Sequence, residues 1–163
     1  MSNLLFILII GIGATATMDL WSIVRKPLLG IPFPNYGMVG RWIAHMTHGQ
    51  FRHDAITASF PVRGEHIIGW IAHYLTGIAF AALLVGIWGD SWIHSPTIGP
   101  ALAVGIGTVA APFLLMQPGM GIGIAASRTQ NPTSARLQSL ITHTVFGFGL
   151  YASGWAVQLA YSI

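Results

Sequence analysis

The stretch IIGWIAHYLTGIAFAALLVGIW, residues 67–88, contains no Asp, Glu, Lys or Arg and decides the fold class. Crossing about 30 Å of hydrocarbon takes roughly 20 apolar residues when the backbone is helical. A backbone in lipid must bond its N–H and C=O groups within the segment, so a single strand is excluded there. Residues 67–88 are therefore predicted to form a membrane-spanning helix.

Three further stretches meet the same length, and they cover 4–23, 98–126 and 137–163. Of the 163 residues, 53% are hydrophobic and only 7% are charged, which is too little charge to cover a soluble globule. No polar linker divides the chain into two hydrophobic blocks. The sequence predicts an all-α polytopic membrane protein, a four-transmembrane-helix bundle forming one domain over 1–163. Composition excludes a soluble enzyme or a nucleic-acid-binding protein.

The basic residues are confined to two of the three predicted connections. All seven Lys and Arg residues lie in 24–66 and 127–136, whereas 89–97 contains Asp90 and no basic residue. Lys and Arg are enriched in cytoplasmic loops, so both basic connections are predicted to face the cytoplasm, with the N-terminus and the C-terminus outside. Anionic lipid headgroups are the expected partners of these loops, beside the bilayer itself.

The cytoplasmic loop 24–66 is predicted to carry a short amphipathic helix over 38–48. Pro27, Pro32 and Pro34 argue against a continuous helix at the start of the loop. Within 38–48, apolar side chains share one face and basic side chains share another. The basic face consists of Arg41, His45 and His48. Such a helix is expected to lie in the headgroup layer.

Six polar or soft side chains fall at one predicted depth in the membrane. Counted from the cytoplasmic boundary at 1.5 Å per residue, they lie roughly 8 to 14 Å inside. They are Asp19, His73, Met116, Gln117, Met120 and His143. A titratable group in hydrocarbon costs about 2.5 to 3.5 kcal/mol, so it normally faces the bundle interior and suggests a function. The common depth predicts one intramembrane site.

Five motifs distributed along the chain carry a family resemblance. They are GATATMD (13–19), GRW (40–42), GWIAHY (69–74), APFLLMQPGMG (111–121) and HTVFGFGLY (143–151). Together they resemble a bacterial family of small inner-membrane proteins, the domain of unknown function numbered 2938. The resemblance implies a four-helix protein of the bacterial inner membrane and brings no activity with it.

The first functional hypothesis is binding or translocation of a cation, either a proton or a soft transition metal, at the intramembrane site. Asp19 supplies charge, and His73 and His143 supply imidazole nitrogens. The thioethers of Met116 and Met120 suit copper(I). Gln117 belongs to the same turn and completes the predicted ligand set.

Two alternatives stay open at the level of sequence. His73 and His143 are candidate axial ligands of a b-type haem, because helix bundles hold such cofactors between facing side chains. Alternatively, the chain is a structural or accessory subunit, or a homo-oligomer, in which the polar groups only join helices. No nucleophile and base pair is recognisable, so an enzyme is the less favoured class.

Overall fold

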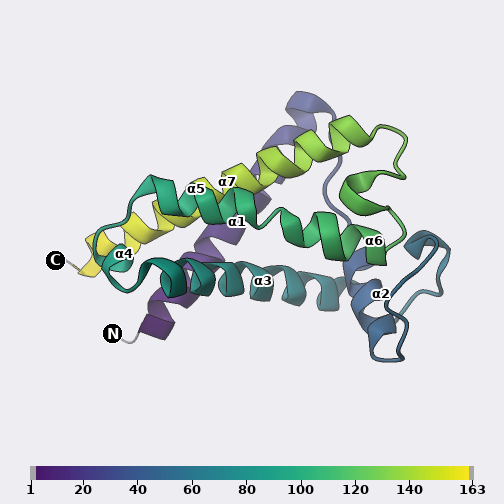
Figure 1. Ribbon diagram of the computed structural model, residues 1–163, viewed down its shortest axis with the longest axis horizontal. Helices are drawn as coiled ribbons and strands as arrows, with labels where there is room; N and C mark the ends of the chain where they lie inside the picture. Colours follow the sequence, from purple (N-terminus) through teal and green to yellow (C-terminus); the bar gives the residue numbers. More distant parts are fainter. Residues whose placement is uncertain (1–2, 162–163) are drawn as a thin grey trace. The chain divides into compact units, whose positions relative to one another are not determined.

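Every regular element of the computed structural model, which describes residues 3–161, is helical (Figure 1). The longer helices are α1 (Asn3–Leu29), α2 (Tyr36–Met46), α3 (Glu65–Trp88), α5 (Ile98–Gly107) and α7 (Pro132–Tyr161). The shorter ones are η1 (Ile56–Ala58), α4 (Ser91–His94), η2 (Pro112–Met116), α6 (Gln117–Gly119) and η3 (Ile124–Ala126). The predicted all-α class is confirmed.

Three segments of the described chain are long and apolar enough to cross a membrane, namely Asn3–Leu29, Glu65–Trp88 and Ile98–Gly119. They overlap the first three predicted spans and indicate a membrane protein. The fourth predicted span, 137–163, falls within the 30-residue helix α7 up to its end, and residues 162–163 lie outside the described residues. Polar side chains interrupt α7, which is not one of the three segments. The count of four spans stays a prediction.

Two predicted boundaries in the first third of the chain differ from the structure. The first span was expected to end at Ile23, but α1 continues to Leu29 with Pro27 inside it. A proline in the last turn removes only one helical hydrogen bond. The residue after the helix is Gly30, whose φ of 67° suits the left-handed position that follows a helix C-terminus. The amphipathic helix occupies Tyr36–Met46 rather than 38–48.

The third apolar segment is interrupted where its prolines lie. α5 ends at Gly107, and a π-helical turn, η2, begins at Pro112, because proline has no N–H for the regular helical bond. α6 contains Pro118 and ends at Gly119. The predicted span 98–126 is therefore too long at its far end, where the chain turns instead of continuing as a helix.

The chain divides into two compact units. The first unit contains the described residues of 1–33, 74–108 and 140–163. The second unit contains 34–73 and 109–139. Helices α3 and α7 each contribute one end to each unit. The prediction of a single domain over the whole chain stays a prediction.

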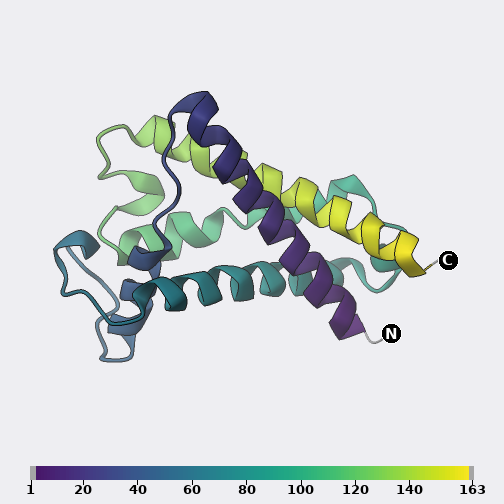
Figure 2. The same ribbon diagram turned by 180° about the vertical axis from the view of Figure 1, so that it is seen from behind.

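The first unit is held together by a buried apolar core and by close helix crossings. Its core includes Ile10, Leu84, Ile93, Phe146 and Leu150. A Cβ added to Gly11 of α1 would lie 2.5 Å from Ile78 Cα of α3. One added to Gly149 of α7 would lie 2.8 Å from Ala14 Cα, at the point where α1 crosses α7 (Figure 2). Small residues at such crossings are how helices approach closely in lipid.

In the second unit, α2 lies directly against the first turns of α3. A Cβ at Gly40 would collide with the backbone carbonyl of Glu65, and one at Gly69 would collide with the carbonyl of Tyr36. The two backbones therefore touch, which brings the side chains beside these glycines into contact. The pairs Tyr36–His73 and Arg41–Glu65 result from these contacts.

Candidate functional site

Asp19 lies in the first unit, on the apolar helix α1, and is 9% exposed. The phenol of Tyr74, on α3, donates a hydrogen bond to its Oδ2 at 3.0 Å. The hydroxyls of Thr15 and Ser22 donate to carbonyls of their own helix. Asp19 therefore bonds across helices, as a polar group enclosed by apolar segments is expected to do.

His143 also lies in the first unit, where α7 meets the end of α5. Its Nδ1 is 3.2 Å from the carbonyl oxygen of Gly105 and 3.2 Å from Oγ1 of Thr108. Thr108 donates its own hydroxyl to Gly105 O at 2.8 Å. Since Gly105 O only accepts, a hydrogen bond between it and Nδ1 requires the proton to be on Nδ1.

His73 lies in the second unit, near the start of α3, among aromatic side chains. Its Nε2 is 3.0 Å from Oη of Tyr36 on α2. The two rings are stacked, with centroids 4.2 Å apart. Trp70 packs edge-on against the imidazole at a centroid distance of 5.9 Å. His73 is thus one member of a phenol–imidazole pair.

The predicted sulfur and amide ligands lie around α6, also in the second unit. Gln117 is 8% exposed and Met120 is 5% exposed. The Oε1 of Gln117 is enclosed and has no hydrogen-bond partner among the described residues. Met116 is half-buried and accepts a backbone hydrogen bond from Met120 at 2.9 Å.

The predicted site residues are distributed over both units. Asp19 and His143 belong to the first unit, whereas His73 and the turn 116–120 belong to the second. Within 3–161, no three His, Asp or Glu side chains converge in a way that could hold a metal ion. The structure gives Asp19, His73 and His143 a hydrogen-bonding partner each.

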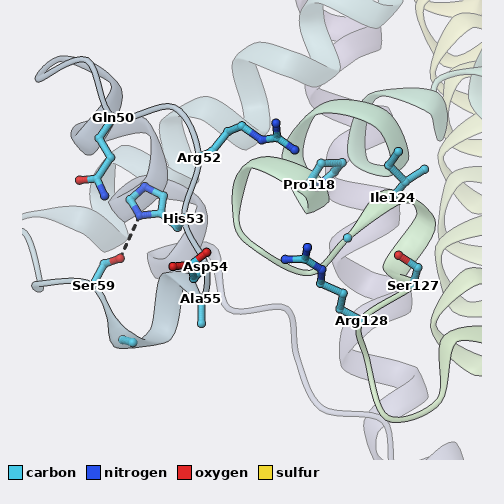
Figure 3. A pocket seen from close by; sticks show the side chains of 12 residues that line it. Gln50, Arg52, His53, Asp54, Ala55, Ser59, Pro118, Ile124, Ser127 and Arg128 are labelled. Atoms are coloured by element: carbon cyan, nitrogen blue, oxygen red, sulfur yellow. Dashed lines mark hydrogen bonds between the residues drawn. The ribbon is translucent and has the colours of Figure 1, made fainter.

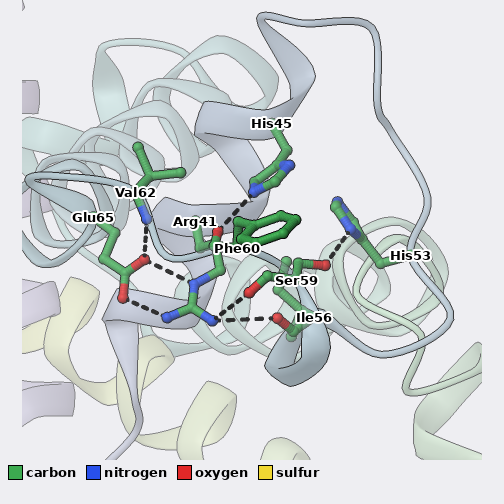
Figure 4. Close-up of polar contacts among 8 residues, drawn as sticks. All are labelled: Arg41, His45, His53, Ile56, Ser59, Phe60, Val62 and Glu65. Atoms are coloured by element: carbon green, nitrogen blue, oxygen red, sulfur yellow. Dashed lines mark hydrogen bonds and ion pairs between the residues drawn. The ribbon is translucent and has the colours of Figure 1, made fainter.

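Sequence reasoning missed a buried ion pair in the second unit (Figure 4). Arg41 approaches Glu65 at two points, Nε to Oε2 and Nη2 to Oε1, both at 2.8 Å. Arg41 is 7% exposed, although the helix pattern placed it on the basic face of a helix expected to lie in the headgroup layer. Hydrogen bonding to Glu65 raises the pKa of Arg41, against the opposing effect of burial. The glycines beside the pair, Gly40 and Gly69, are the signal that two backbones approach here.

The fold and these polar pairs define a class, that of all-helical proteins with membrane-length apolar helices. Within that class, the family described as "Protein of unknown function (DUF2938)" matches residues 8–157. The chain belongs to this family, which confirms the predicted resemblance. No curated protein and no solved structure matches the chain.

Proposed function

We propose that this protein is an integral membrane protein that binds a proton at Asp19 and passes it across the bilayer. The observation that carries the proposal is a carboxyl group, 9% exposed, on a helix apolar enough to span a membrane. The Tyr74 phenol lies 3.0 Å from it and supplies a hydrogen-bonding partner that can exchange a proton. Carboxyl groups at such positions are typical of proton relays in membrane transport.

A proton suits these residues better than a metal ion. A metal site in a protein takes three or four converging ligands, and no three His, Asp or Glu side chains of 3–161 form such a group. A proton needs a single acceptor atom. The imidazoles of His73 and His143, each hydrogen-bonded to a neighbour, are further groups that can accept and release protons.

The test measures proton flux into liposomes that contain the purified full-length chain and a trapped pH-sensitive dye. A potassium gradient with valinomycin supplies the driving potential. Wild-type protein is expected to acidify or alkalinise the lumen several-fold faster than empty liposomes. D19N keeps the size of the side chain and an acceptor oxygen but cannot bind the proton, so its flux should fall to that of empty liposomes.

Two variants separate function from structure. Y74F removes the hydrogen bond to Asp19 and should slow the flux and change its pH dependence. T17V is the matched control, because Thr17 lies on α1 and bonds only to Gly13 O of that helix among the described contacts, at 2.9 Å. Equal flux in D19N and wild type, with both folded by thermal unfolding in detergent, contradicts the proposal.

The arrangement in the membrane is part of the proposal. We propose four crossings, the fourth formed by α7, in a bacterial inner membrane. Both basic connections then face the cytoplasm against anionic headgroups, and both termini lie outside. The support is the confinement of all seven Lys and Arg residues to two connections.

The other predictions from sequence have distinct signatures in the same purified sample. Haem b between His73 and His143 gives a Soret band, and a soft metal at Met116 and Met120 gives a stoichiometric metal content. An accessory subunit is recovered with one stoichiometric partner protein. Any of these results, together with no proton flux, replaces the proton proposal.

A further inference from the structure

A cavity of about 670 Å³ lies within the second unit (Figure 3). One wall is the loop 50–59, between α2 and α3, and the other is the segment 118–128, which begins in α6. Its charged and hydrogen-bonding lining includes Gln50, Arg52, His53, Asp54, Ser127 and Arg128. None of these residues belongs to the proposed proton site.

The two walls are joined by the backbone. The N–H of His53 donates to Gly119 O at 2.9 Å, and the N–H of Ile56 donates to Met120 O at 3.0 Å. The second wall turns through Ala125, whose φ of 46° is uncommon for a residue with a Cβ. Arg136 donates to the carbonyl of Ala125 at 2.8 Å and supports this turn. Backbone hydrogen bonds therefore hold the two walls of the cavity together.

Arg52 and Arg128 project into the cavity from opposite walls (Figure 3). Neither guanidinium forms an ion pair or a side-chain hydrogen bond with another residue of 3–161. Arg41, by contrast, is fully paired with Glu65. Two unpaired guanidinium groups facing one cavity leave charge and ten N–H donors for an anion, and the planar fork of arginine matches a phosphate in particular.

The other lining residues make the charge differ from one side of the cavity to the other. Asp54 adds one negative charge against the two arginines (Figure 3), so the anion is expected on the arginine side and a hydroxyl or ammonium substituent beside Asp54. His53 is 7% exposed and is held by Ser59 Oγ, 2.9 Å from its Nδ1. Its enclosed Nε2 has no partner among the described residues. Burial lowers the pKa of His53, with His45 acting in the same direction and Asp54 against it.

We propose that this cavity binds a phosphate group between Arg52 and Arg128, carried either by a phospholipid headgroup or by a free phosphate. Apolar side chains at the cavity fit the first source, since Ile124, in its lining, is 61% exposed. Phe51, next to Arg52, is 60% exposed. The inference is independent of the proton proposal, because it uses other residues and a binding readout.

The test is calorimetric titration of the full chain in an uncharged maltoside detergent at low salt. The probes are inorganic phosphate, a short-chain phosphatidylglycerol, and a diacylglycerol with the same chains but no phosphate. Wild-type protein should bind one or both phosphate probes and not the diacylglycerol. R52Q and R128Q should each weaken binding roughly tenfold, the loss expected for one charge-assisted contact.

R63Q is the matched control, because Arg63 is exposed, lies on the same connection as Arg52 and does not line the cavity. It should bind as wild type does. Binding of phosphatidylglycerol alone assigns the site to a lipid, and equal binding of inorganic phosphate assigns it to free phosphate.

The proposal is overturned if neither phosphate probe binds better than the diacylglycerol, or if R63Q loses as much affinity as R52Q and R128Q. Arg52 and Arg128 are both exposed, and neither side chain forms an ion pair or a hydrogen bond with another residue of 3–161, so both variants should unfold at the wild-type temperature. If one variant unfolds at a lower temperature than wild type, the affinity of the other variant, on the opposite wall, decides the test.

Discussion

Arg41 Nη2 donates to Glu65 Oε1 at 2.8 Å, while Arg41 Nε donates to Oε2 of the same carboxylate, also at 2.8 Å. The pair is almost fully buried, and its remaining groups are bonded as well. Arg41 Nη1 donates to the carbonyl of Ser59 at 3.1 Å, and Glu65 Oε2 accepts from the N–H of Val62 at 3.0 Å. The pair thereby joins α2, the start of α3 and the loop between them (Figure 4).

Replacing one member of this pair should be more damaging than replacing both. R41M leaves the Glu65 carboxylate buried without its partner, and the expected loss of unfolding free energy in detergent is about 3 to 5 kcal/mol. The double variant R41M/E65L should recover a large part of that loss. R63M, at an exposed arginine, should stay within about 0.5 kcal/mol of wild type. If the double variant is no more stable than R41M, Arg41 and Glu65 do not compensate each other's buried charge.

The crossing of α5 and α7 should be sensitive to a single methyl group. A Cβ at Gly105 would lie 2.5 Å from Gly147 Cα, whereas one at Gly107 meets nothing within 4 Å. G105A should therefore lower the unfolding free energy by about 1 to 3 kcal/mol through overpacking. G107A, on the same helix, should be neutral or slightly stabilising. Equal effects of the two substitutions in denaturant titrations are not compatible with this packing.

The wall of the phosphate cavity depends on Gly121. Its φ of 85° favours glycine, and a Cβ there would collide with the backbone carbonyl of Asp54. G121A should cost about 2 to 5 kcal/mol, from backbone strain and displacement of the loop. G49A, at φ 78° with nothing within 4 Å, should cost only about 1 to 2 kcal/mol. Trypsin should cut after Arg52 faster in G121A than in wild type, and no faster in G49A than in wild type. An unchanged cutting rate in G121A contradicts the displacement of the loop.

The stability of the second unit should fall at acidic pH because of His53. Its pKa in the folded chain is lowered by burial and by His45, with Asp54 opposing. The unfolded chain therefore takes up the proton more readily, and stability that is complete above about pH 6.5 is lost as the pH falls below that value. The unfolding free energy should change by at most about 1.4 kcal/mol per pH unit because of this one group. H53Q should lack this part of the slope between pH 7.5 and 5, and an identical slope contradicts the assignment.

The chain contains no cysteine, so its topology can be mapped with single cysteines. Ser95, in the connection that contains Asp90, and Thr133, in the second basic connection, are both exposed. With a membrane-impermeant maleimide on intact bacterial cells expressing the protein, S95C should be labelled and T133C should be labelled only after permeabilisation. Labelling of both positions from outside contradicts the proposed orientation.

Several features followed from local sequence because their causes are local. Apolar stretches such as 67–88 predicted helices, since lipid leaves a backbone no other way to bond its polar groups. The third segment is interrupted where Pro112 and Pro118 each remove a helical donor. Five motifs carried the family resemblance, which the match over residues 8–157 confirms.

The pairing of polar groups was decided only by tertiary structure. Depth along a helix can be counted from sequence, but rotation and crossing position cannot, and these decide that Asp19 bonds Tyr74 and His73 bonds Tyr36. Arg41 and Glu65 are 24 residues apart with a loop between them, so no helical spacing relates them.

The sequence by itself determined the helical class, the family and the candidate polar residues. Only the tertiary structure decided how those residues pair and that Arg52 and Arg128 face one cavity. The physical reason is that the length of an apolar stretch decides helix formation within that stretch alone. Pairing of side chains depends instead on how closely two backbones approach. At Gly40 and Gly69 the close approach is possible because neither residue has a Cβ.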